Sequence, residues 1–230
     1  SAEELEALVV RRTEGEPLEH VVGWTTFHGL RLEVDPGLFV PRPRSELLVE
    51  ETASLLRSFR RPGEGAVVVD LCCGIGAIGA ALAAEVPGVT LHAADIDPRA
   101  VACARRNLAR WSGTVHLGDL FAALPRRLRG RVDVLVSSPP YVPPEEIRLL
   151  PAEARDFEPR LALDGGSGGL AVAERIAREA REWLVPDGHL AVEAAEHQVE
   201  RLEQTCGDLG YAARAVTSDG AAVVLGRLPR

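Results

Sequence analysis

The chain has 230 residues, of which 46% are hydrophobic, and a formal net charge of −8, which predicts a folded α/β domain with a small additional unit rather than a disordered chain. An acidic chain lacks the basic face that broad nucleic-acid binding needs, so nucleic acid is not an expected partner. Lysine is absent, which excludes Schiff-base chemistry and P-loop phosphate transfer.

The first sixty residues predict a small unit of helices and extended strands. Ser1 and Glu4 have the spacing of a capping box, which begins a helix. Apolar residues at helix or strand spacing then indicate the other elements. The expected elements are helices over 1–12, 18–22 and 45–59, a β-hairpin within 24–34 that turns at 28–29, and a short strand over 38–40.

From Gly65 the pattern changes to a regular alternation of strands and helices. Strands are expected over 66–71, 89–96, 114–117, 132–137, 189–193, 214–217 and 221–226, and helices over 75–85, 98–111, 169–184 and 198–209. This alternation predicts a mostly parallel seven-stranded sheet with helices on both faces. The last two strands, joined by a turn at 218–220, predict an antiparallel terminal hairpin strand. The expected division is a small amino-terminal unit, 1–62, and an α/β domain, 63–230.

The four cysteines, at positions 72, 73, 103 and 206, form no CxxC pair, so no metal site is expected. Adjacent Cys72 and Cys73 are typical of small buried residues in a reducing compartment. The sequence contains neither a signal peptide nor a membrane-spanning apolar run, so we expect a cytoplasmic protein without a membrane partner. The oligomeric state and the presence of a segment upstream of Ser1 stay open.

A glycine-containing turn follows the first strand of the α/β domain. Asp70, Gly74 and Gly76 lie where this strand leads into a helix, and glycines there let the backbone approach a ligand closely. The spacing is not that of a dinucleotide fingerprint, so a dinucleotide is the weaker interpretation.

Two further carboxylates end the next two strands. Asp95 can accept hydrogen bonds from ribose hydroxyls, and Asp119 can accept from an exocyclic adenine amine with Leu120 or Phe121 against the ring. Each residue alone is typical of a turn or cap, as Asp97 before Pro98 is expected to be. Together they predict a nucleoside pocket, because the carboxyl ends of parallel strands meet at one edge of the sheet.

The strand over 132–137 ends abruptly at Ser138-Pro139-Pro140-Tyr141. Its continuous apolar run is typical of a strand buried on both faces of a parallel sheet. Pro139 cannot donate to a ladder and Pro140 keeps it extended, so the chain leaves the sheet stiffly, at the end where open α/β sheets bind ligands. In the alternative interpretation, the prolines only end the strand and Tyr141 only packs.

This order of motifs resembles the class I, Rossmann-like methyltransferases that use S-adenosylmethionine. More narrowly, Pro41-Arg42-Pro43 before a Glu46-bearing helix, Ser138 to Tyr141, and Phe157 to Gly166 resemble the protein-(glutamine-N(5)) methyltransferases of peptide chain release factors. The resemblance runs from about Gly15 to Gly226. It implies methyl transfer from S-adenosylmethionine to the side-chain amide nitrogen of a protein glutamine, with a release factor as the protein partner.

The resemblance also implies roles for individual residues. The Pro139 carbonyl would accept one amide hydrogen, Ser138 would hold the amide with Ser137 as a substitute, and Tyr141 would close the pocket. Arg42 is either a pocket or a packing residue, and Glu158 is either a substrate lid or an ordinary ion pair. The implied catalytic residues are Ser138, Pro139 and Tyr141; the substrate-binding residues are these with Pro140, Arg42 and Glu158; the cofactor-binding residues are Asp70, Cys72, Gly74, Gly76, Asp95, Ile96, Asp119, Leu120 and Ser138.

Three departures from the family pattern bear on the substrate. Ser138 stands where the family has Asn, Cys72 replaces the first glycine of the cofactor loop, and only residues 1–22 could be a remnant of the family's amino-terminal helical domain. Two alternatives therefore stay open. One is a methyltransferase for a nucleic-acid amino group or a small molecule. The other is a non-catalytic protein that binds S-adenosylmethionine.

Overall fold

The computed structural model describes residues 1–58, 65–218 and 220–230. The helices of more than three residues are α1 (Ala2–Thr13), α2 (Leu18–Val22), α3 (Glu46–Ser58), α4 (Ala77–Glu85), α5 (Pro98–Leu108), α6 (Ala152–Phe157), α7 (Arg160–Leu163), α8 (Ala171–Ala180), α9 (Val199–Asp208) and the 3₁₀ turn η3 (Leu120–Ala123). The strands are β1 (Trp24–Phe27), β2 (Leu30–Glu33), β3 (Val67–Leu71), β4 (Thr90–Asp95), β5 (Thr114–Leu117), β6 (Val132–Ser137), β7 (Leu184–Ala194), β8 (Ala212–Ser218) and β9 (Ala221–Arg227).

Three of the sequence predictions fall on residues that the structure does not describe. The boundary predicted between 62 and 63, the expected helix end at Phe59 and the centre of the turn at 218–220 lie outside the described residues. The division into two domains therefore stays a prediction. Within the described ranges, no helix is long and apolar enough to cross a membrane.

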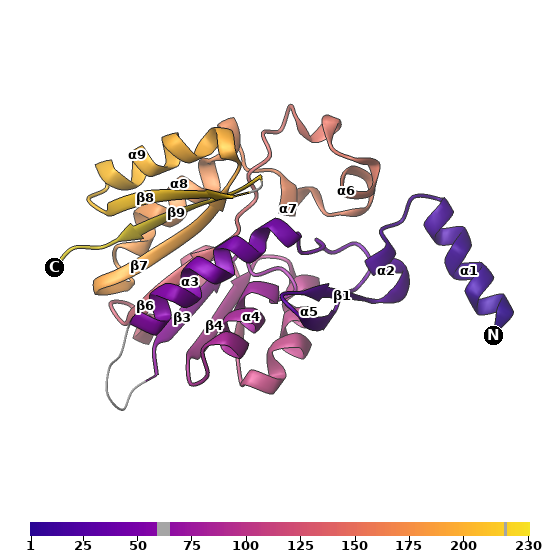
Figure 1. Ribbon diagram of the computed structural model, residues 1–230, viewed down its shortest axis with the longest axis horizontal. Helices are drawn as coiled ribbons and strands as arrows, with labels where there is room; N and C mark the ends of the chain where they lie inside the picture. The colour runs from indigo at the N-terminus through magenta and orange to yellow at the C-terminus, as the bar shows by residue number, and fades with distance from the viewer. Residues whose placement is uncertain (59–64, 219) are drawn as a thin grey trace.

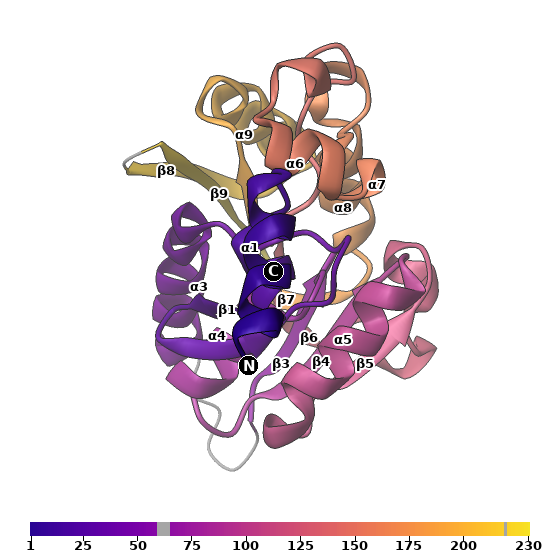
Figure 2. The same ribbon diagram turned by 90° about the vertical axis from the view of Figure 1, so that its right-hand side faces the viewer.

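The larger sheet has seven strands in the described part of the chain, in the order β5-β4-β3-β6-β7-β9-β8 (Figures 1 and 2). Neighbouring strands from β5 to β7 run parallel, while β9 is antiparallel to both β7 and β8. This confirms the predicted α/β fold with its antiparallel hairpin strand. Strand β6 lies at the centre and is buried at every residue, which explains its uninterrupted apolar sequence.

Two apolar layers cover the sheet. One contains buried residues of α3, α4 and α5, and the other contains those of α8, α9 and η3 (Figures 1 and 2). Strand β6 contributes side chains to both layers, because Val134 and Val136 face the first layer while Leu135 faces the second. Burying each such aliphatic side chain contributes about 1.5–3 kcal/mol, so β6 and the turn that follows it are firmly held.

The amino-terminal segments are attached to this core unequally. Helix α1 has the predicted Ser1 capping box but no buried residue, and it extends away from the body of the molecule (Figure 1). The β1–β2 hairpin, in contrast, buries Phe27 and Leu32 in the same apolar layer as α4 and α5. Asn107 of α5 also exchanges two hydrogen bonds with the Glu33 backbone, at 2.8 and 2.9 Å. The hairpin is therefore fixed to the layer of α4 and α5 by both apolar and polar contacts.

Two local predictions are wrong. Residues 38–40 form no strand, because their backbone groups bond to side chains: the His20 ring donates to the Leu38 carbonyl at 2.7 Å, and the Val40 N–H donates to Glu158 at 3.3 Å. The strand expected over 189–193 is the other: β7 already begins at Leu184, a residue that was expected to end the preceding helix. There Asp187 has a φ of +64° and its N–H donates to the Leu228 carbonyl, so the strand continues past the irregularity.

Candidate active site

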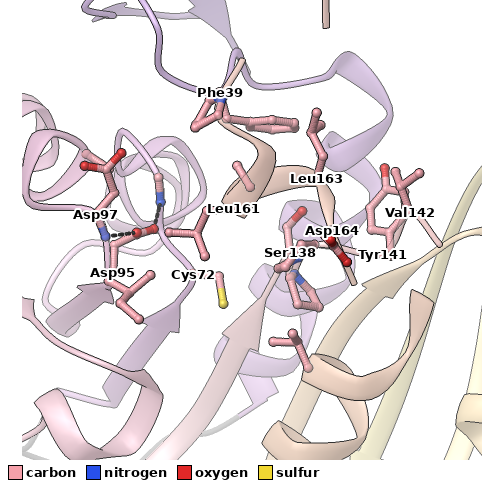
Figure 3. A pocket seen from close by; sticks show the side chains of 18 of the residues that line it. Phe39, Cys72, Asp95, Asp97, Ser138, Tyr141, Val142, Leu161, Leu163 and Asp164 are labelled. Carbon is pink, nitrogen blue, oxygen red and sulfur yellow. Dashed lines mark hydrogen bonds between the residues drawn. The ribbon is translucent and has the colours of Figure 1, made fainter. Parts of the chain in front are cut away.

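A cavity of about 630 Å³ opens at the carboxyl ends of β3, β4 and β6, within the size range of small-molecule sites. Figure 3 shows Asp95 toward one side of it, Ser138 and Tyr141 toward the other, and Cys72 between them. The predicted site residues that line the cavity are Arg42, Cys72, Gly74, Asp95, Ile96, Asp119, Leu120, Ser138, Pro139, Pro140 and Tyr141. Asp70, Gly76 and Glu158 do not line it.

The turn after β3 has an unusual backbone. Cys72, Gly74 and Gly76 have φ values of +56°, +54° and +81°, in the left-handed region that favours glycine. For Cys72 this conformation costs about 1–2 kcal/mol. The space beside Gly74 is open, since a Cβ placed there would meet no atom within 4 Å. The turn therefore leaves room for a ligand against the backbone at Gly74.

Asp70 and Gly76 shape this turn from beneath, which is why they do not line the cavity. Asp70 is fully buried, and one of its carboxylate oxygens accepts from the Gly79 N–H of α4 at 2.9 Å. Burial, with a smaller effect of Asp95, raises the pKa of Asp70 to about 7. Gly76 packs so tightly that a Cβ there would lie 3.1 Å from the Leu108 side chain. Because Gly76 is left-handed, α4 begins at Ala77 rather than at the predicted residue 75.

The carboxylate of Asp95 is fixed by the backbone around it. One oxygen accepts from the Gly74 N–H at 2.8 Å and the other from the Asp97 N–H at 2.9 Å (Figure 3). Each oxygen keeps a further lone pair for a ligand. Burial raises the pKa of Asp95. Asp97 caps α5 as predicted, since its side chain accepts from the Arg99 N–H.

Asp119 lies at the end of β5 and pairs with an arginine that the sequence analysis missed. Arg175 of α8 donates to both oxygens of Asp119, at 2.9 and 2.8 Å, and also lines the cavity. Leu120 follows with a φ of +45°, so the chain turns sharply there. The exposed Ile96 side chain lines the same cavity.

The turn after β6 brings Ser138 to Tyr141 into the cavity. Ser137 is fully buried and its hydroxyl donates to the Leu71 carbonyl at 2.8 Å, so it is committed to the sheet and is no substitute for Ser138. The Ser138 hydroxyl makes no hydrogen bond to any residue that the structure describes, and it lines the cavity. The interpretation in which this turn only ends a strand is therefore disfavoured.

The segment of residues 157–166 holds this turn from outside. Its Gly165 N–H donates to the Val142 carbonyl at 2.9 Å, and the Val142 N–H donates to the Leu163 carbonyl at 3.0 Å. A Cβ on Gly165 would lie 2.7 Å from the Pro140 carbonyl oxygen, so glycine is required for this approach. Gln198, which the sequence analysis also missed, donates to the Tyr141 carbonyl at 2.8 Å.

Glu158 and Arg42 form a largely buried ion pair. The Glu158 side chain is 1% exposed, and Arg42 Nη2 donates to both of its oxygens at 2.7 and 2.6 Å. Burial raises the pKa of Glu158 and Arg42 opposes this rise. Of the two expectations for Glu158, a substrate lid or an ion pair, the structure has the ion pair, and Glu158 holds Arg42 without lining the cavity itself.

Arg44 is a further lining residue that the sequence analysis did not select. Its position directly after the Pro-Arg-Pro turn could have identified it from the sequence. No sequence pattern could have identified Arg175 or Gln198, because elements distant in the chain bring them to the site. Among the described residues, no group of three or more His, Cys, Asp or Glu side chains is arranged to hold a metal ion.

Comparisons with known proteins give the family of this chain. The family model described as a methyltransferase small domain matches residues 44–153. A release factor glutamine methyltransferase of Streptomyces coelicolor is 40% identical over 83% of this chain, which spans 67% of that relative's length. A 4-amino-L-phenylalanine/4-methylamino-L-phenylalanine methyltransferase of Streptomyces pristinaespiralis is 35% identical over 92% of this chain and 74% of its own length.

A solved structure has the same fold. The Thermus thermophilus 16S rRNA N2 G1207 methyltransferase, in complex with S-adenosylmethionine and guanosine, superposes with a TM-score of 0.61 at 20% identity, over 89% of this chain and 49% of that one. The relatives and the family model make this chain a methyltransferase, with S-adenosylmethionine as its cofactor, and its sheet order and the solved structure give it a Rossmann-like fold. Within that class, the chain belongs to the release factor glutamine methyltransferases.

Proposed function

We propose that this enzyme methylates the side-chain amide nitrogen of a glutamine in a peptide chain release factor. The observation that carries the proposal is that Ser138, Pro139 and Tyr141 share one cavity with Asp95 and Asp119. Identity of 40% to a release factor glutamine methyltransferase supports the choice of acceptor. A release-factor substrate supports a cytoplasmic location for the proposed activity.

The cavity residues fit the cofactor. S-adenosylmethionine supplies a methyl group on a positively charged sulfur, from which a nucleophile displaces it in line. Asp95 has lone pairs left for ribose hydroxyls, and Asp119, held by Arg175, has lone pairs left for an exocyclic amine. The open space beside Gly74 lets the backbone approach the ligand. Leu120 and Ile96 supply apolar contacts for a planar base.

The acceptor side must position a weak nucleophile. A carboxamide nitrogen delocalises its lone pair, so both of its hydrogens have to be engaged for the lone pair to face the methyl carbon. The Ser138 hydroxyl and the Pro139 carbonyl are the two acceptors that the cavity offers for these hydrogens. Tyr141 closes the acceptor end. Positioning of this kind contributes a large part of a rate enhancement. The methylated nitrogen then loses its proton readily without a dedicated base.

Ser138 favours a second candidate acceptor, a small primary amine. A hydroxyl makes fewer simultaneous contacts than the family's Asn carboxamide. An aromatic amine needs acceptors for its N–H groups alone, and the relative from Streptomyces pristinaespiralis is named for such an amine. The net charge of −8 disfavours the nucleic-acid alternative. Membership of a methyltransferase family argues against the non-catalytic alternative.

Intact-mass measurement tests the proposal. The enzyme is incubated with S-adenosylmethionine and a purified release factor, and cofactor binding is confirmed in the same sample by calorimetry. We expect one methyl increment, which disappears when the acceptor glutamine of the release factor is replaced. No increment in a sample that binds cofactor would refute the release factor as acceptor. A parallel reaction with 4-amino-L-phenylalanine then tests the second candidate.

A further inference from the structure

A charged network lies beside Tyr141 on the wall of the cavity. Arg44, just before α3, donates to the Tyr141 hydroxyl oxygen, and its guanidinium carbon lies 5.6 Å from the centre of the Tyr141 ring. Arg44 Nε lies 3.8 Å from an oxygen of Glu193 in β7. Because Ser137 of β6 pairs with Val192 of β7, Glu193 lies next to Ser138 at the strand ends.

Glu193 fixes Arg44 at this place. The Glu193 side chain is 2% exposed, and its second oxygen has no hydrogen-bond partner among the described residues. A buried carboxylate is costly unless a cation lies close to it, so the pair is held together more firmly than two exposed side chains would be. Arg44 itself is 46% exposed and lines the cavity. It therefore connects a buried anchor to the open site.

Arg44 has donors to spare on this wall. Of its five N–H groups, those on Nη1 make no hydrogen bond to any residue that the structure describes. Arg42 and Arg175 also keep one terminal nitrogen each without a hydrogen bond to a described residue, but their guanidinium groups are tied to carboxylates, Arg42 to both oxygens of Glu158 and Arg175 to both oxygens of Asp119. Arg44 is also the arginine that contacts Tyr141 directly.

The proposed acceptor needs such a donor. Ser138 and the Pro139 carbonyl accept hydrogen bonds from the nitrogen of a carboxamide. The oxygen of the same carboxamide loses its hydrogen bonds to water on binding, and a buried acceptor without a partner costs free energy. We propose that Arg44 donates to the carbonyl oxygen of the acceptor glutamine, and so selects amides over amines, which have no such oxygen. This inference rests on the proposed function.

Binding and kinetic measurements on Arg44→Ala and Arg44→Lys test the inference. The Kd of the release factor is measured on enzyme saturated with S-adenosylhomocysteine, and KM and kcat are measured with S-adenosylmethionine. We expect Arg44→Ala to raise the Kd and KM for the release factor by about 10- to 100-fold, and Arg44→Lys to restore part of the loss. The Kd for S-adenosylhomocysteine should stay within about twofold, which also shows that the variant is folded.

Two controls separate the possible outcomes. Arg214→Ala removes an exposed arginine that pairs with Glu51 of α3 outside the cavity, and should change none of these constants. Tyr141→Phe removes the hydroxyl that Arg44 contacts. If Arg44→Ala has no additional effect in the Tyr141→Phe background, Arg44 acts only by holding Tyr141 and the inference is overturned. The inference is also overturned if the wild type is active and Arg44→Ala has the wild-type Kd and KM for the release factor. A wild type that does not methylate the release factor would refute the proposed function itself.

Discussion

Replacing Gly165 by alanine should damage the acceptor end of the site more than it damages the fold. The added Cβ would lie 2.4 Å from the Gly169 carbonyl oxygen and 2.7 Å from both the Pro140 carbonyl oxygen and the Tyr141 Cα. Carbon and oxygen atoms seldom approach closer than roughly 3.3 Å, so these groups must separate by roughly 0.6–0.9 Å. All three are backbone atoms, which cannot rotate away as a flexible side chain would.

The expected magnitudes follow from this displacement. Overpacking of this size costs about 1–3 kcal/mol of unfolding free energy. A displacement of about 1 Å in groups that position substrate costs on the order of 100-fold in rate. Because the contacts involve Pro140 and Tyr141, kcat/KM for the methyl acceptor should fall, while the affinity for S-adenosylhomocysteine at Asp95 and Asp119 should stay close to wild type.

Urea unfolding, steady-state kinetics and calorimetry measure the three quantities. Gly207→Ala is the matched control, because Gly207 lies in α9 and a Cβ there would meet nothing within 4 Å. We expect that variant to gain up to about 1 kcal/mol in stability at unchanged turnover. Wild-type stability and turnover in Gly165→Ala would refute the steric argument. An equal loss of cofactor affinity would refute its confinement to the acceptor end.

Three further predictions concern residues at or beneath the cavity. Ser138→Asn should raise kcat/KM on a glutamine acceptor by about 5- to 100-fold, since one well-placed hydrogen bond is worth about 1–3 kcal/mol, and an unchanged or lower value would show that Ser138 is not a weakened family residue. Cys72→Gly should relieve about 1 kcal/mol of backbone strain and tighten S-adenosylhomocysteine binding in calorimetry, whereas Cys72→Ala, which keeps the Cβ, should not; equal tightening in both would contradict the strain argument. Burial raises the pKa of Asp70 from 3.8 to about 7, so the folded state binds more protons than the unfolded state between these values. Wild type should therefore lose stability relative to Asp70→Asn as the pH rises through this window, by at most about 1.4 kcal/mol per pH unit, and a difference in unfolding free energy that does not vary with pH would contradict it.

The sequence alone was enough for the features that local rules control. Strand and helix periods predicted the seven-stranded sheet, and the capping patterns at Ser1 and Asp97 predicted where two helices begin. Strand-end residues such as Asp95 and Ser138 were predicted to share one cavity, because parallel strands bring their carboxyl ends to the same edge. These inferences need neighbours in sequence and a known sheet geometry, and nothing more.

Tertiary structure decided the features that depend on contacts between distant segments. Arg175 reaches Asp119 from 56 positions along the chain, and Arg44 reaches Tyr141 from 97 positions. Residues 38–40 have strand-like sequence but bond to His20 and Glu158 instead of a neighbouring strand. Asp70 has the sequence position of a ligand contact, yet packing places it beneath the turn. In each case the packing of helices and loops on the sheet determines the position or the partner of the residue. A local sequence pattern contains no information about that packing.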